Sequence, residues 1–270
     1  MRLVVPAAGR GMRLAGSDNP LPKLLIPILG RPLISHLLRM ASATGLFSEV
    51  VIILGPWFEP VAETIQDLAS HIKWESATEI LCIENPKFEL TNNVYSLYLA
   101  RDYLEGEVVV HNSDVLVAPP LLTRLGSGIQ GKARVLVERM SPVPEGETKV
   151  VVDSVDQVTD IAEAIGSDRA RGRYVGICAF DSSACEAFRD AVVSLVEHEE
   201  VGVFYTKALR MLAMRRSLDA VWTAGLPWFE IDTIEDLRAI GPSAREIVQQ
   251  IKVPTTGRFC QVRSVRENRA

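Results

Sequence analysis

The chain has 270 residues, of which 47% are hydrophobic and 23% charged, and its formal net charge is −5. This length can bury a sizeable core in one large α/β domain or two small ones, and the acidic balance argues against a nucleic-acid-binding surface, which is usually basic. No run approaches the ~20 apolar residues of a membrane span, and the N-terminus lacks the pattern of a signal peptide. We therefore expect a cytoplasmic, small-molecule enzyme with no nucleic acid and no membrane as partner.

The first stretch of the chain has the features of an anion-binding turn. Residues 3–6 predict a buried strand, and small residues follow at once: Ala7, Ala8, Gly9 and Gly11. Glycine lets a ligand approach the backbone, and successive amide N–H groups can form an anion-binding concavity. Arg13 and Lys23 add two cations, a combination that favours nucleoside triphosphate binding over an ordinary turn with surface cations. The P-loop and Rossmann patterns are both excluded, because no lysine follows Gly11 and Leu14 replaces the third glycine.

The next segments alternate between helical and extended patterns. Apolar residues at helical spacing predict helices between Pro32 and Gly45 and over residues 59–71, while short apolar runs predict strands at 49–54 and 79–83. Alternating strands and helices imply a mostly parallel sheet with helices on both faces. Connections between such strands are right-handed.

Residues 85–101 combine an extended start with a helix. Thr91 or Asn92 can cap this helix, which makes a simple capped amphipathic helix one reading of the segment. The adjacent amides Asn92 and Asn93 at the helix start are also good donors and acceptors for the edge of a pyrimidine. We favour the second reading.

Two acids follow predicted strands and are candidate metal ligands. Asp114 comes after the strand at 107–110, where open α/β sheets bind ligands, and Asp232 ends the strand that starts at Trp228. Each could instead cap the turn or helix that follows it, since Thr233 and Asp236 resemble a capping box. If both face one site, they could share a Mg²⁺ ion, which takes one or two carboxylates together with substrate phosphates.

The remaining segments complete the predicted topology. We expect strands at 133–138, 174–180 and 218–222, a β-hairpin of 149–153 with 158–161, and helices at 182–197, 204–214 and 243–251. The polar stretch 168–173 predicts a solvated loop. Residues 1–253 then form the folded domain, and residues 254–270 are a loosely attached C-terminal tail.

Separated motifs, in order along the chain, resemble those of one family. They are Ala8-Gly9-x-Gly11-x-Arg13-Leu14 with Pro22-Lys23-x-Leu25, Asn85-Pro86 with Thr91-Asn92-Asn93-x-Tyr95-Ser96-Leu97, Tyr174-x-Gly176-Ile177, and Trp228-x-Glu230-Ile231-Asp232-Thr233. They are similar to the sugar-phosphate nucleotidyltransferases, and most similar to the bacterial phosphocholine and aminoalkylphosphonate cytidylyltransferases. The sequence departs from the family at Met12, where Ser or Thr is usual.

The resemblance implies a fold. It is a single three-layer α/β domain with a central mixed, mostly parallel sheet, Rossmann-like and of the glycosyltransferase-A-type nucleotidyltransferase kind. The antiparallel hairpin near 149–161 would be an insertion that forms a lid or a wall of the acceptor pocket.

The resemblance also implies roles for individual residues. The nucleotide would be bound by Ala7, Ala8, Gly9, Gly11, Asn85, Asn93, Ser96 and Ser113. The catalytic residues would be Lys23, Arg13, Asp114 and Asp232. In these roles Lys23 offsets charge on the α-phosphate, Arg13 holds the departing pyrophosphate, and Asp114 with Asp232 binds Mg²⁺.

The implied reaction transfers CMP from CTP to a phosphorylated small alcohol, with phosphocholine as the leading acceptor. A choline group favours aromatic faces and a carboxylate, so the acceptor-binding candidates are Tyr174, Trp228 and Glu230. Aminoethylphosphonate, inositol phosphate and sugar 1-phosphates stay open as acceptors. A nucleotide-sugar-dependent glycosyltransferase and a catalytically silent nucleotide sensor stay open as functions, and a homodimer as an oligomeric state.

Overall fold

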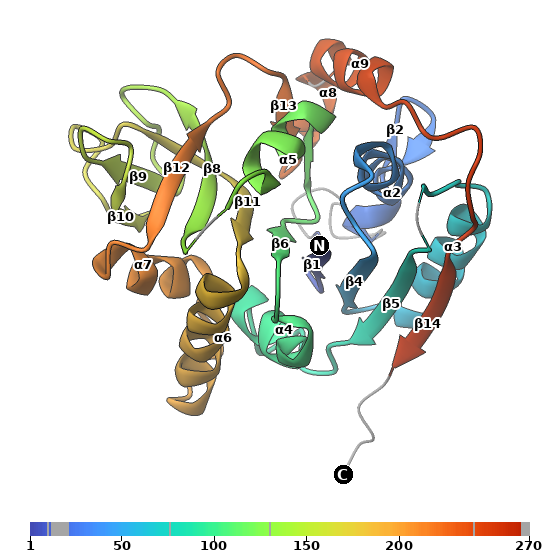
Figure 1. Cartoon of the computed structure of the whole chain (residues 1–270), viewed down its shortest axis with the longest axis horizontal. Helices are drawn as coiled ribbons and strands as arrows, with labels where there is room; N and C mark the ends of the chain where they lie inside the picture. The colour runs from blue at the N-terminus through green and yellow to red at the C-terminus, as the bar shows by residue number, and fades with distance from the viewer. Residues whose placement is uncertain (10, 12–21, 76, 130, 240, 266–270) are drawn as a thin grey trace.

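The computed structural model describes residues 1–9, 11, 22–75, 77–129, 131–239 and 241–265. Its centre is a ten-stranded mixed sheet (Figure 1). Five neighbouring strands run parallel in the order β14 (Gln261–Val265), β5 (Glu79–Glu84), β4 (Glu49–Leu54), β1 (Arg2–Ala7) and β6 (Val108–His111). Strands β1, β4, β5 and β6 are rich in Val and Ile, and their middle residues are buried on both faces, as expected for a parallel sheet covered by helices, whereas β14 is mostly exposed.

The second half of the sheet is largely antiparallel. Strand β11 (Gly172–Phe180) runs antiparallel to β6 and also pairs with β8 (Ala133–Arg139) and β9 (Lys149–Val152). Strand β9 forms the expected hairpin with β10 (Val158–Ala162), and β12 (Leu218–Trp222) pairs with β8 in parallel. An isolated antiparallel bridge also joins Gln157, the residue before β10, to Asp219 of β12.

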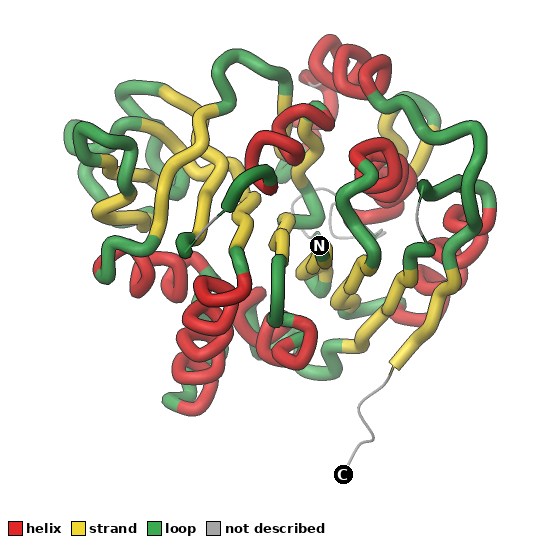
Figure 2. The backbone as a smooth tube through the Cα atoms, in the orientation of Figure 1, coloured by secondary structure: helices red, strands yellow, loops and turns green. Residues whose placement is uncertain are grey.

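Helices cover both faces of the sheet, which gives three layers (Figure 2). One apolar core packs the sheet against α2 (Leu33–Thr44), α3 (Phe58–Ser70), α5 (Pro119–Gly126) and α9 (Gly241–Gln250). A second core packs it against α4 (Asn93–Leu99), α6 (Ser182–Glu197) and α7 (Thr206–Met214). Successive residues of a strand alternate between the two cores: Leu3 and Val5 lie in the first, Val4 in the second. None of the described helices is long and apolar enough to cross a membrane.

Short elements complete the chain and position the site. They are η1 (Lys23–Leu25), β2 (Pro27–Ile28), β3 (Arg31–Pro32), η2 (Arg101–Tyr103), β7 (Val115–Val117), β13 (Trp228–Glu230) and α8 (Ile234–Ala239). Strands β7 and β13 form a separate antiparallel pair, with Glu230 opposite Val115. This pairing joins two segments that are more than a hundred residues apart in the sequence.

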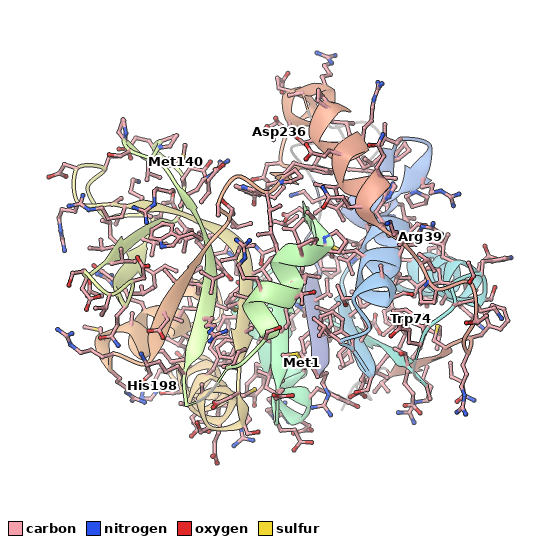
Figure 3. The ribbon with its side chains drawn as sticks, turned by 45° about the horizontal axis from the view of Figure 1, so that its top comes forward. Met1, Arg39, Trp74, Met140, His198 and Asp236 are labelled. Atoms are coloured by element: carbon pink, nitrogen blue, oxygen red, sulfur yellow. The ribbon has the colours of Figure 1, made fainter. Side chains whose placement is uncertain are left out.

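The predicted single α/β domain with a mixed sheet and an antiparallel hairpin is confirmed. The expected loose tail at 254–270 is wrong for its described part, because residues 261–265 form β14 and extend the sheet beside β5. The backbones of Trp74 and Arg258 also exchange two hydrogen bonds, of 2.9 and 3.0 Å, before β14 begins. Strand β14 satisfies backbone groups that β5 would otherwise expose as an edge strand. Trp74 marks this end of the molecule, and Met140, after β8, the opposite end (Figure 3).

Candidate active site

A cavity of about 800 Å³ opens beyond the carboxyl ends of the parallel strands. Three of its walls come from segments that follow β1, β5 and β6, where ligands bind in open α/β sheets. The other walls come from β11, β13, the start of α7 and the two ends of the β9–β10 hairpin. The cavity therefore lies between the parallel half of the sheet and the hairpin.

Lys23 lines this cavity and lies between two carboxylates. Its Nζ donates to Asp114 Oδ2 at 2.7 Å and to Asp232 Oδ1 at 2.6 Å. The short helix η1 holds the lysine in place, because the next residue, Leu24, is buried in the core. Burial favours the neutral amine, but the charges of Asp114 and Asp232 outweigh it and raise the pKa of Lys23, so the ammonium form is stabilised.

The pairing of β7 with β13 brings the two predicted acids together. The backbone N–H of Ile231 donates to the Asp114 carbonyl at 3.0 Å, just beyond the paired strands. Thr233 and Asp236 make the reciprocal hydrogen bonds that start α8. The Asp232 carboxylate faces Lys23, so the two predicted metal ligands lie in one site, as their positions at strand ends suggested.

Glu230 joins these acids to make a group of three carboxylates. One oxygen from each of Asp114, Glu230 and Asp232 lies within 4.8 Å of the others. Burial, followed by the charges of Asp114, Asp232 and Glu147, raises the pKa of Glu230 to about 8, while Lys23 lowers it. Sequence analysis assigned Glu230 to the acceptor alone. The sequence contained a signal for this cluster. Glu230 stands two residues before Asp232, and in an extended chain the side chains of residues i and i+2 point to the same side.

The carboxylate group fits a hard cation such as Mg²⁺. Asp114 Oδ1 is buried and has no hydrogen-bond partner among the described residues, although a buried carboxylate oxygen normally has one. Carboxylate oxygens from one or two residues are the protein ligands that Mg²⁺ prefers beside substrate phosphates. Asp114 and Asp232, the two predicted magnesium ligands, thus lie in a carboxylate group that could bind such a metal, and Glu230 is a third candidate ligand.

Most of the residues predicted to bind the nucleotide line the cavity. They are Ala8, Gly9, Gly11, Asn85, Asn93, Ser96 and Ser113. Ala7 does not line the cavity; it is the last residue of β1 and pairs with Leu54. Arg13 lies outside the described residues, so its predicted contact with pyrophosphate stays a prediction.

Asn85 and Ser96 are almost fully buried and hydrogen-bond to other protein groups. Asn85 Nδ2 lies 3.3 Å from both Ser96 Oγ and Thr91 Oγ1, and its Oδ1 accepts the backbone N–H of Lys87 at 2.9 Å. Their exposed fractions are 1% and 2%. These contacts position the segment between β5 and α4, including the start of the helix at Asn93.

Of the three residues predicted to bind the acceptor, two line the cavity and one does not. Tyr174 and Glu230 line the cavity, and the Tyr174 hydroxyl lies 2.8 Å from that of Tyr205, which donates to Asn112 Oδ1 at 2.9 Å. Trp228 does not line it: the Arg173 guanidinium lies 4.5 Å from the centre of its ring. Glu138 and Glu147 hold Arg173 in this position at 2.8 Å each. Contact between Trp228 and the acceptor stays a prediction.

Several lining residues were not found by sequence analysis. They are Phe88, Asn112, Glu147, Thr148, Glu163, Phe204, Tyr205 and Thr206. Glu163 follows β10, and its backbone carbonyl accepts from the completely buried Lys149 Nζ at 2.9 Å. The sequence did offer a signal for Glu147, Thr148 and Glu163. The hairpin near 149–161 was expected to form a wall of the acceptor pocket, and these residues lie at its two ends.

Residues 3–175 match the family model of the MobA-like NTP transferase domain, and the chain belongs to this family. The chain is 32% identical over 166 residues to a CMP-5'-(3-aminopropyl)phosphonate synthase of Streptomyces rubellomurinus, an alignment that covers 61% of this chain and 25% of that protein. The chain spans between a quarter and a half of the length of the first curated relatives that it matches.

Two solved structures share the fold. The inositol-1-phosphate CTP transferase from T. maritima has a TM-score of 0.73 at 20% identity, over 91% of this chain and 95% of that chain. The CTP:phosphocholine cytidylyltransferase from Streptococcus pneumoniae has a TM-score of 0.70 at 20% identity, over 89% of this chain and 97% of that chain. Both likenesses confirm the predicted nucleotidyltransferase fold.

Proposed function

We propose that this chain transfers CMP from CTP to a phosphorylated small alcohol, with phosphocholine as the leading acceptor. The observation that carries the proposal is the position of Lys23 between Asp114 and Asp232 inside the cavity. In this arrangement the Lys23 ammonium can bind a phosphate, and the two carboxylates can bind a metal. The ammonium and the carboxylates are directly hydrogen-bonded to each other. The products would be a CDP-alcohol and pyrophosphate.

The reaction needs positioning and charge stabilisation more than proton transfer. An oxygen of the acceptor phosphate attacks the α-phosphorus of CTP, and the bond from that phosphorus to the β-phosphate oxygen breaks as pyrophosphate leaves. The attacking oxygen is already anionic, so no general base is required. Lys23 would donate to the α-phosphate oxygens, where negative charge must be offset during transfer. We assign the departing pyrophosphate to Arg13, as the family resemblance implies.

Asp114 and Asp232 would hold Mg²⁺, with Glu230 as a third candidate ligand. The buried, unpartnered Asp114 Oδ1 supports this assignment within the described part of the chain. When bound, Mg²⁺ would supply positive charge that offsets the negative charge of the phosphates. The same carboxylates hold Lys23, so they couple the position of the lysine to that of the phosphates.

The hairpin side of the cavity supports an acceptor that carries a cationic amine. Glu147 and Glu163 line this side, while Lys23 is the one positively charged residue among the described lining residues. Tyr174 and Phe204 add aromatic rings to the lining, and such rings bind quaternary ammonium groups. Two similar proteins, a CMP-5'-(3-aminopropyl)phosphonate synthase and a CTP:phosphocholine cytidylyltransferase, are named for compounds that carry an amine, which supports an amine-bearing acceptor. Inositol phosphate and sugar 1-phosphates are the alternatives.

Product identification tests this proposal. The protein is incubated with CTP, Mg²⁺ and one acceptor at a time, and CDP-linked products are identified by mass spectrometry. We expect CDP-choline from phosphocholine and no product after addition of EDTA. A CDP product from a sugar 1-phosphate alone would contradict the acceptor assignment, and undiminished product in EDTA would contradict the metal assignment.

A further inference from the structure

Lys149, the first residue of β9, is a completely buried lysine. Among the residues that the structure describes, it is the only lysine, arginine, aspartate or glutamate that is buried, and its exposed fraction is 0%. A lysine is rarely buried completely unless its charge is paired. Here the ammonium donates a hydrogen bond to the backbone carbonyl of Glu163 at 2.9 Å, and it lies 3.8 Å from the carboxylate of Glu145, whose side chain is 92% exposed.

These contacts do not explain Lys149 as a source of stability. Moving an ammonium group out of water carries a large desolvation cost, which a single hydrogen bond to a carbonyl offsets only in part. An ion pair with a mostly exposed carboxylate adds little, because water screens it. An uncharged side chain of the same length would fill the same space without this cost. The buried ammonium therefore indicates a role other than stabilisation.

Lys149 lies where the two ends of the hairpin meet the cavity. Residues 146–148, directly before it, line the cavity. Its strand partner Ala162 directly precedes Glu163, which lines the cavity as well. Lys149 itself is not among the lining residues. Its backbone thus belongs to one end of the hairpin, while its ammonium holds the backbone of the other end.

The rest of the fold holds the two ends to different extents. At the first end, Arg173 donates to Glu147 Oε1 at 2.8 Å, and the Thr148 carbonyl accepts a backbone N–H at 2.8 Å. Both donors belong to β11. Within the described part of the chain, no such bond from β11 reaches Glu163, and the hydrogen bond from Lys149 is the one that fixes its backbone. The position of the Glu163 end therefore depends on the lysine.

We propose that Lys149 is a positioning residue that holds the Glu163 carboxylate at the cavity wall, where the acceptor amine would bind. The inference rests on the proposed function, because that function assigns a cationic amine to the hairpin side. Lys149 does not touch the substrate and acts through the Glu163 carbonyl. The buried charge thus serves acceptor recognition instead of stability.

The variant Lys149→Met keeps the length and the apolar part of the side chain and removes the ammonium. The matched control is Lys132→Met, which removes a partly exposed lysine outside the cavity lining. Three properties are measured for both: Tm, hydrogen exchange of the peptide that spans residues 158–170, and KM for phosphocholine and for CTP. We expect the Tm of Lys149→Met to lie within about 2 °C of the wild-type value or above it, because a desolvation cost is removed together with the hydrogen bond.

Hydrogen exchange over residues 158–170 should be faster in Lys149→Met than in the control, because the turn after β10 has lost its hydrogen bond. KM for phosphocholine should rise about 3- to 10-fold, as expected for a displaced carboxylate at the cavity rim, while KM for CTP should stay within about twofold. A variant that fails to fold, an unchanged exchange rate or an unchanged KM for phosphocholine would each overturn the inference.

A double variant separates an action through Glu163 from an independent effect. In a Glu163→Gln background, Lys149→Met should cause no further rise in KM for phosphocholine, because the carboxylate that the lysine positions is already neutral. A further rise of the same size would contradict the inference. A folded wild-type protein that makes no CDP product would instead refute the proposed function, and hydrogen exchange would still test whether Lys149 holds Glu163.

Discussion

The Lys23 ammonium contacts both strand-end acids, and this contact was not foreseeable from the sequence. Lys23 and Asp232 are separated by 209 positions, yet Nζ and Oδ1 lie 2.6 Å apart. Sequence analysis could place each acid at the end of a strand, because a local apolar run precedes it. It could not show the pairing of β7 with β13, which depends on contacts between distant segments. Lys23, Asp114 and Asp232 could thus be predicted individually from the sequence, but the contacts between them could not.

Removal of the Lys23 ammonium should abolish most of the activity and leave the fold intact. In Lys23→Ala we expect kcat to fall by roughly 100-fold or more, because a fixed cation at a phosphate offsets charge in the transition state. The matched control is Lys132→Ala, which removes a lysine paired with Asp219 at 3.0 Å and outside the cavity lining. Steady-state rates and circular dichroism measure the two effects. A Lys23→Ala rate within a few-fold of that of the control would contradict the assigned role.

The carboxyl group of Glu230 should make stability depend on pH in metal-free protein. Its pKa is raised to about 8 from a usual value of 4.5, so the folded state binds more protons than the unfolded state between these values. Stability contributed by protonated Glu230 is therefore fully present below about pH 4.5 and is lost as pH rises through about 8. Glu230→Gln removes this dependence. Thermal unfolding in EDTA should show the Tm of the variant rising relative to wild type between pH 5 and about 8.5. A constant difference across this range would contradict the raised pKa.

At the scale of elements, the two ends of the β9–β10 hairpin form one wall of the cavity, and we propose that this wall distinguishes acceptors. Its strands were predicted from their alternating pattern, but the burial of Lys149 beneath Glu163 depends on packing that no local pattern reveals. The same holds for Tyr205, whose segment reads only as the beginning of a helix. Its hydrogen bonds with Asn93 and Asn112 join the residue before α7 to two segments that lie about a hundred residues earlier in the chain.

Glu163 should contribute to binding of a cationic acceptor. In Glu163→Gln we expect KM for phosphocholine to rise about 3- to 10-fold, since a rim charge attracts a cation only moderately through water. KM for CTP should not change, because the residue lies on the hairpin side. The control is Glu145→Gln, which neutralises an exposed glutamate of the loop before β9 that does not line the cavity. Initial rates at varied phosphocholine test this. Equal KM values in the two variants would contradict a role for Glu163.

Strand β14 should stabilise the edge of the sheet. Sequence analysis missed it because five mostly exposed residues carry no clear apolar pattern, and its pairing with β5 is decided by tertiary structure. Deletion of residues 261–270 should lower Tm by several degrees, at about 2–4 °C per kcal/mol for a protein of this size. Arg263→Ala, which keeps the strand and removes a partly exposed ion pair with Glu79, should have little effect. Differential scanning calorimetry compares them, and equal Tm values for the deletion and wild type would contradict this role.

At the scale of the whole molecule, two differently built halves meet at the cavity. The described lining residues within 6–11 and 85–96 are uncharged, the antiparallel half contributes Glu147 and Glu163 to the lining, and the three carboxylates with Lys23 lie between them. The alternation of strands and helices in the sequence predicted the parallel half apart from β14. The antiparallel half was predicted as one hairpin and several separate strands, because the order β9–β11–β8–β12 reflects long-range pairing. We propose that this division places the nucleotide and the acceptor on opposite sides of Lys23 and the carboxylates.

The most direct test is pyrophosphate release with Mg²⁺. CTP, UTP, dTTP, ATP and GTP are each assayed with phosphocholine, aminoethylphosphonate, inositol phosphate and sugar 1-phosphates. Asp114→Asn is assayed in parallel, with Asp219→Asn as a control outside the cavity lining. The account predicts release with CTP and phosphocholine that depends on the acceptor, stops in EDTA and is lost in Asp114→Asn but not in Asp219→Asn. Folded, nucleotide-binding protein that releases no pyrophosphate with any pair, or full activity in Asp114→Asn, would contradict it.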